Sequence, residues 1–119
     1  MFVIRVAGNV ISDHQLGSIE YAIDHLGSNL VVVLGHTNCG AVGAAIGGHT
    51  GGFIKSITDE IKAAIGEETD GYKASCLNVE HAISKIKDNL PMLNGSDSQG
   101  AKVIGAIYHI NDGHVEFLD

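Results

Sequence analysis

The sequence predicts an α/β fold: a mostly parallel sheet flanked by helices, with a C-terminal β-hairpin. Three observations predict it. Residues 30–34 (LVVVL) are apolar at every position, as in a strand covered on both faces. Several other stretches repeat their apolar residues at the helical period. Near the C-terminus, two strand-like runs flank Asn-Asp-Gly, which is a hairpin turn. Strands that alternate with helices form layered α/β domains, and at 119 residues we expect one domain over residues 1–119.

The first third of the chain is read as strand, helix, strand and short helix. Residues 2–6 (FVIRV) are rich in β-branched side chains and precede Ala-Gly-Asn, which predicts a strand ending in a turn. Ser12 and Asp13 can cap a helix that ends at Gly27. Its apolar face comprises Leu16, Ile19, Ile23 and Leu26. After the strand at 30–34, residues 41–46 form a short helix that is broken by the glycine-rich GGHTGG.

The remainder contains two longer helices and the hairpin. One helix begins near Phe53, and its apolar face comprises Ile54, Ile57, Ile61 and Ile65. The next covers residues 75–90 and ends before Pro91, with Val79, Ile83, Ile86 and Leu90 aligned. NGSDSQG (94–100) is a polar loop, and the hairpin strands are expected at 102–110 and 114–118.

Charge and composition exclude several function classes. The formal net charge is −7, and the seven Lys and Arg residues are scattered, so no basic patch is available for nucleic acid or for an anionic membrane. The longest continuous apolar run, 30–34, is too short to cross a bilayer, and the first ten residues do not resemble a signal peptide. Two cysteines do not suggest a disulfide scaffold. We therefore expect a soluble, cytoplasmic protein.

His36 and Cys39 are the residues that indicate chemistry. They follow the strand at 30–34, and ligands in open α/β sheets gather at the carboxyl ends of strands. Gly35 is expected to allow a sharp turn, so that both side chains reach one point. The free N–H groups of Gly40 and Ala41 at the next helix start would favour a thiolate at Cys39. Imidazole and thiolate are natural zinc ligands.

Spacing alone leaves other interpretations open. Cys39 can be a small buried apolar residue while His36 hydrogen-bonds the turn. The two can also form a nucleophilic Cys–His dyad.

Four blocks of the sequence, in order, resemble the β-class carbonic anhydrases. They are FVIRVAGNV, SIEYAIDHLG, LVVVLGHTNCGAVGAAI and VIGAIYHINDGHVEFL, and together they cover nearly the whole chain. The resemblance implies a zinc ion held by Cys, His and Cys, of which the last two match His36 and Cys39. It implies reversible hydration of CO2 to bicarbonate, with the backbone N–H of Gly40 near a substrate oxygen.

The sequence departs from the family at the first zinc ligand. That ligand belongs to a Cys-x-Asp-x-Arg block, and no such block occurs in these 119 residues. Two ligands make a weak site, so we expect zinc to be poorly held and activity to be weak or absent. The missing donor could come from His49, Cys76 or another chain. Otherwise the chain is a truncated member that has lost its upstream segment, or a natural short homologue that uses the same scaffold without turnover, to bind a small anion or to regulate an oligomer.

The resemblance also predicts how the sheet is built. In the family, the strand bearing Cys-x-Asp-x-Arg lies between the strands that match residues 2–6 and 30–34. Without it, unpaired backbone groups must find partners. We expect residues 2–6 to pair directly beside 30–34, closing the sheet; the alternative is a strand borrowed from a partner chain. We also expect a homodimer or higher homo-oligomer, because the family builds its sites near a dimer interface.

Overall fold

The computed structural model describes residues 1–49, 51–93 and 100–118. Its helices are α1 (Asp13–Asp24), α2 (Gly40–Ile46), α3 (Ile54–Ile65) and α4 (Gly71–Asn89); its strands are β1 (Leu30–His36), β2 (Lys102–Tyr108) and β3 (Val115–Leu118). Short 3-10 turns, η1 (Ala7–Asn9) and η2 (Pro91–Leu93), complete the order. The predicted α/β class is confirmed, as is the order of elements from α1 onward. Residues 94–99 of the predicted polar loop lie outside the described residues.

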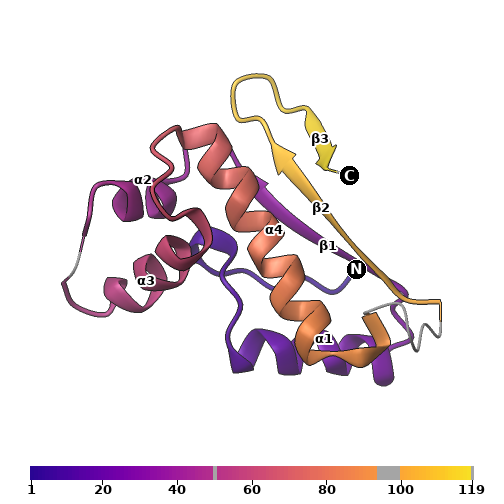
Figure 1. Ribbon diagram of the computed structural model, residues 1–119. Helices are drawn as coiled ribbons and strands as arrows, with labels where there is room; N and C mark the ends of the chain where they lie inside the picture. Colours follow the sequence, from indigo (N-terminus) through magenta and orange to yellow (C-terminus); the bar gives the residue numbers. More distant parts are fainter. Residues whose placement is uncertain (50, 94–99, 119) are drawn as a thin grey trace.

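The sheet of the described residues has the order β1-β2-β3. β1 and β2 are parallel, with Leu34 opposite Ala106, and β3 returns antiparallel to β2 as the second strand of the predicted hairpin. Figure 1 shows β2 in the middle and α4 crossing one face of the sheet. The sheet is therefore smaller than expected, with one parallel pair and one antiparallel pair.

The predicted strand at residues 2–6 is wrong, and so is the predicted closure of the sheet. These residues pair with no strand in the described part of the chain, and β1 pairs only with β2. Residues 1–7 are exposed along their whole length. The physical reason lies in η1. Gly8 is buried against Ile61 of α3, and its carbonyl accepts a hydrogen bond from Asn78 of α4, so the chain packs into the core from η1 onward while the residues before it stay exposed.

β1 is an edge strand and not the central strand that its apolar run predicted. Its side chains alternate: Val33 is buried, whereas Leu30, Val32 and Leu34 are each about half exposed, at 52%, 43% and 48%. The reason is that α4 packs on one face of the sheet, so that the side chains of β1 on the other face stay partly exposed.

Helix α4 organises the core. It packs on β1 and β2 and also contacts α2 and α3, as Figure 1 shows. The main core lies between α4, α1 and the sheet; it comprises Ile11, Ile19, Val33, Val79, Ala82, Ile86, Leu90, Leu93, Ala101, Val103 and Ile107. A second cluster joins α2, α3 and the start of α4, comprising Val42, Ala45, Ile61, Ile65 and Ala74.

Some boundaries differ from the predicted ones for local reasons. α4 begins four residues before the predicted position 75, because the Asp70 carboxylate accepts a hydrogen bond from the backbone N–H of Lys73 at 2.9 Å. α1 ends at Asp24, which leaves Leu26 54% exposed and not on the buried face. Among the described helices, none combines the length and the apolar character needed to cross a membrane.

Candidate metal-binding loop

His36 and Cys39 lie at the two ends of the short turn that joins β1 to α2. His36 is the last residue of β1, and Cys39 is the N-cap residue of α2. Between them Asn38 takes a left-handed backbone conformation, with φ 53°. Asparagine tolerates this conformation better than most residues. The chain therefore turns at Asn38.

The prediction that Gly35 makes the turn is wrong. Gly35 is a regular residue of β1, and it is buried. A β-carbon at this position would lie 2.7 Å from Cγ2 of Val79 and 3.2 Å from Cδ1 of Ile107. Glycine is therefore required for the close approach of α4 to the sheet.

The hydrogen bond of His36 defines which ring nitrogen is free. Nδ1 lies 2.8 Å from the carbonyl oxygen of Thr37. A carbonyl only accepts hydrogen bonds, so Nδ1 carries the proton and donates, and Nε2 keeps its lone pair. Histidines that bind metals usually donate their other ring N–H in this way. His36 is exposed, so a ligand could reach Nε2.

Cys39 and Gly40 occupy the start of α2. Cys39 is half-buried, carries a free thiol and packs against the cluster of α2 and α3. Its carbonyl accepts from the N–H of Gly43 at 3.0 Å, which begins the helix. Gly40 is the first helical residue and is exposed. N–H groups in the first turn of a helix have no partner within that helix, so that of Gly40 can face a ligand.

The described residues do not supply a complete metal site. Among them, no three His, Cys, Asp or Glu side chains are arranged to hold one metal ion. Of the two candidate donors in this chain, His49 already has its Nε2 in a hydrogen bond, 3.2 Å from the carbonyl oxygen of Gly51. Cys76 lies on α4, where partial burial raises the pKa of its thiol and so disfavours a thiolate. Zinc sites use three or four protein ligands, so His36 and Cys39 do not fit zinc by themselves.

One buried donor beside this loop also lacks a partner. In the described part of the chain, no acceptor faces Nδ2 of Asn9, although that atom is buried. The Asn9 side chain is near Gly35, since its Oδ1 would lie 3.4 Å from a β-carbon placed there. Buried polar groups are normally satisfied. A side chain at Gly35 would point toward Val79 of α4, whereas His36, the next residue of the strand, points to the opposite face, so this donor is not part of the loop of His36 and Cys39.

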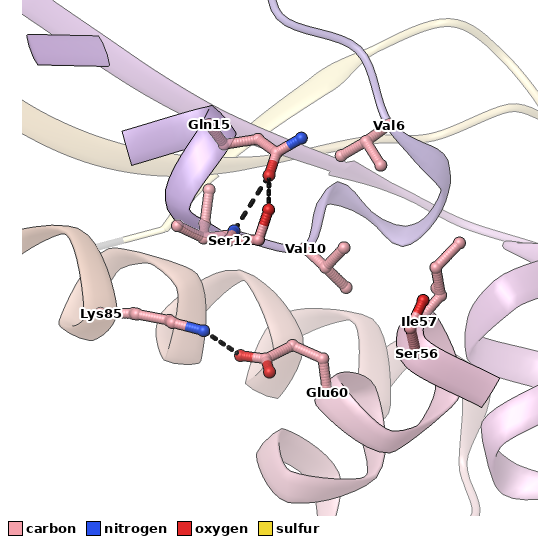
Figure 2. A pocket seen from close by; sticks show the side chains of 9 residues that line it. Val6, Val10, Ser12, Gln15, Ser56, Ile57, Glu60 and Lys85 are labelled. Carbon is pink, nitrogen blue, oxygen red and sulfur yellow. Dashed lines mark hydrogen bonds and ion pairs between the residues drawn. The ribbon is translucent and has the colours of Figure 1, made fainter. Parts of the chain in front are cut away.

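A hollow of about 290 Å³ lies elsewhere, between η1, α1, α3 and α4 (Figure 2). Its lining includes Val6, Val10, Ser12, Gln15, Ser56, Ile57, Glu60 and Lys85. The Lys85 ammonium donates to the Glu60 carboxylate at 2.8 Å and holds the pKa of that carboxyl below its ordinary value. The charged pair is already satisfied, and His36, Cys39 and Gly40 are absent from this lining.

Known proteins resemble this chain over nearly its whole length. A family model described as carbonic anhydrase matches residues 1–115. "Carbonic anhydrase 2" of Mycobacterium tuberculosis is 44% identical over 130 aligned positions, which cover 100% of this chain and 63% of that protein. A carbonic anhydrase of Mycolicibacterium smegmatis is 35% identical, covering 98% of this chain and 62% of that protein. The chain thus spans a little over three fifths of the relatives' length.

Solved structures agree with the sequence relatives. The β-carbonic anhydrase CafA of Aspergillus fumigatus superposes with a TM-score of 0.86 at 28% identity, over 98% of this chain and 62% of that chain. The β-carbonic anhydrase of Coccomyxa, solved with acetazolamide, gives a TM-score of 0.82 at 28% identity, over 98% of this chain and 60% of that one. The chain therefore belongs to the β-class carbonic anhydrase family.

Proposed function

We propose that this chain serves the family reaction, the reversible hydration of CO2 to bicarbonate, with zinc as the metal. His36 and Cys39 supply two of the zinc ligands, and the backbone N–H of Gly40 faces the substrate. The observation that carries the proposal is the hydrogen bond from His36 Nδ1 to the carbonyl of Thr37, because it leaves Nε2 as a metal-binding lone pair at the end of β1.

The proposed site is incomplete in these 119 residues. The described residues hold no third ligand, and the sequence has neither Cys-x-Asp-x-Arg nor an arginine other than Arg5. Zinc is therefore held weakly, and hydration by this chain alone is slow or absent. His49, Cys76 or a second chain is the candidate source of the missing donor. We further propose a cytoplasmic homodimer or higher homo-oligomer; relatives from Sordaria macrospora are described as tetrameric.

A second function is a scaffold that binds a small anion or regulates an oligomer without turnover. The incomplete ligand set of the described residues favours it.

Metal analysis and a CO2 hydration assay separate these functions. We expect the purified chain to bind zinc weakly, to lose it on dialysis, and to lose the remaining affinity in His36→Ala and Cys39→Ser. Cys76→Ala removes the other thiol and tests Cys76 as the missing donor: a retained zinc affinity excludes it, and a lost affinity identifies it. Zinc binding that survives both His36→Ala and Cys39→Ser refutes the proposed site. Fast hydration that is lost in His36→Ala refutes the weak activity and the scaffold function.

A further inference from the structure

Thr37 joins the loop of His36 and Cys39 to the β2–β3 hairpin. Its backbone N–H donates to the carbonyl of Tyr108 at 3.0 Å, which continues the pairing of β1 and β2 by one residue. Its hydroxyl Oγ1 accepts from the backbone N–H of Ile110 at 2.9 Å. Its carbonyl accepts from His36 Nδ1 at 2.8 Å. One residue therefore bonds to the hairpin twice and to the candidate ligand once.

The hairpin that Thr37 contacts is itself fixed. The N–H of His109 donates to the carbonyl of His114 at 2.9 Å, and the N–H of Gly113 donates to the carbonyl of His109 at 2.8 Å. The His109 and His114 rings are stacked, with their centroids 4.1 Å apart. These contacts close the turn between β2 and β3.

A carboxylate ties the same hairpin to α4. Glu116 of β3 accepts from Nε2 of His109 at 2.9 Å and from the hydroxyl of Tyr72 at 2.8 Å. Tyr72 lies in the first turn of α4, so the hairpin is attached to the longest helix of the fold. A bond from Thr37 to Ile110 is therefore a bond to a rigid support.

We infer that Thr37 is a positioning residue, through which the hairpin holds His36 with the proton on Nδ1 and the lone pair on Nε2. Two hydrogen bonds to the hairpin fix the backbone N–H and the side chain of Thr37, and the carbonyl of this same residue is the acceptor that His36 needs. The importance of the tautomer for zinc rests on the proposed function. The presence of this tautomer does not depend on the proposed function, because the hydrogen bonds that select it are formed by the chain alone, without a metal.

The test compares Thr37→Val with Thr37→Ser in metal-free protein. Valine keeps the β-branched shape and removes only the hydroxyl, whereas serine restores the acceptor. Nitrogen-15 NMR at pH 8.5, above the range in which imidazoles ordinarily titrate, distinguishes the two neutral tautomers of His36. Amide hydrogen exchange at Ile110 reports the hydroxyl bond directly. Thr69→Val, at an exposed position in the loop before α4, is the matched control.

We expect the wild type to have the proton of His36 on Nδ1. In Thr37→Val the ratio of the Nδ1-protonated to the Nε2-protonated tautomer of His36 should fall about threefold or more, as expected for one lost hydrogen bond. The rate of amide hydrogen exchange at Ile110 should rise by about the same factor. Thr37→Ser should restore both values, and Thr69→Val should change neither. Unchanged values in Thr37→Val overturn the inference. So does a wild type with the proton on Nε2, which tests the geometry even if the valine variant does not fold.

Zinc affinity separates this inference from the proposed function. A wild type that binds no zinc, but shows the Nδ1 tautomer and its loss in Thr37→Val, refutes the zinc site and supports the role of Thr37. If zinc binds, its affinity should fall about threefold or more in Thr37→Val and recover in Thr37→Ser. If zinc binds and its affinity is unchanged in Thr37→Val, Thr37 does not position His36 for the metal.

Discussion

Val79 of α4 occupies the space that a side chain at Gly35 of β1 would need. Its Cγ2 would lie 2.7 Å from a β-carbon at Gly35, and its Cγ1 would lie 2.7 Å from a β-carbon at Gly105 of β2. Val79 is fully buried. The two glycines thus allow α4 to pack closely on both parallel strands. They also determine how near α4 lies to the end of β1 that carries His36.

Gly35→Ala should destabilise the protein by about 1–3 kcal/mol, because Val79 is β-branched and cannot rotate its methyl groups away without a cost. Urea unfolding followed by circular dichroism measures the loss. Gly17→Ala in α1 is the control: nothing lies within 4 Å of the added β-carbon, so replacing a mid-helix glycine should stabilise by about 0.5–1 kcal/mol. Equal effects of the two substitutions would contradict the packing argument.

Asn78→Ala should cost about 1–3 kcal/mol of the free energy of unfolding. The Asn78 amide donates to the carbonyl of Gly8 at 2.7 Å, and Asn78 is only 2% exposed. Its removal leaves a buried carbonyl without a donor. Asn89→Ala is the control, because that amide donates to the carbonyl of Lys85 on an exposed surface; its cost should stay under about 0.5 kcal/mol. Thermal unfolding of both variants compares them.

The sequence predicted best what depends on local pattern. Ile61 and Ile65 repeat at helical spacing and are buried in α3, and Asn111-Asp112-Gly113 lies in the connection of the observed hairpin. The predicted strand at residues 2–6 was wrong because β-propensity favours an extended backbone but does not provide a neighbouring strand. The sequence also did not reveal why position 35 is glycine. A turn is a local explanation for glycine, whereas the contact with Val79 joins residues 44 positions apart and follows from the packing of α4.

For the candidate site, the sequence predicted that His36 and Cys39 follow the apolar run 30–34, and the structure has His36 as the last residue of β1 and Cys39 at the start of α2. The convergence of His36 and Cys39 on one metal stays a prediction. Thr37 was missed because its partner is the backbone of Ile110, 73 residues away, and a backbone donor leaves no residue-type signal. His109 and Glu116 were not paired by the sequence for a related reason: their contact depends on the register of β2 and β3.

Lys85→Met should reduce the pH dependence of stability in acid. The hydrogen bond and charge of Lys85 lower the pKa of Glu60 below 4.5, its ordinary value, so the ionised carboxylate stabilises the folded state above that pH. This stability is lost as the pH falls through the lower folded pKa. In Lys85→Met this loss of stability in acid should be smaller. The difference should be about 0.5–1 kcal/mol at most, because the side chains of Lys85 and Glu60 are both partly exposed. Urea unfolding from pH 7 to pH 3 measures it.

The control for that experiment is Lys55→Met. Lys55 pairs with Asp59 on the same helix, but their side chains are 54% and 60% exposed, so water screens the pair. Its stability curve against pH should follow the wild type. A curve for Lys85→Met that also follows the wild type would contradict the assigned role of the Glu60–Lys85 pair.

Cys76 should react slowly with thiol reagents in the folded protein. Partial burial on α4 is the largest cause that raises the pKa of its thiol, and the carboxylates of Glu116 and Glu80 raise it further. Alkylation needs the thiolate, so folding reduces both the thiolate fraction and the access of the reagent. In a Cys39→Ser background, alkylation of Cys76 by iodoacetamide at pH 7.5 should be several-fold slower in the folded chain than in urea. Raising the pH to 9 should speed the folded reaction. A folded rate equal to the unfolded rate would contradict the burial argument and would favour Cys76 over His49 as the candidate third zinc ligand.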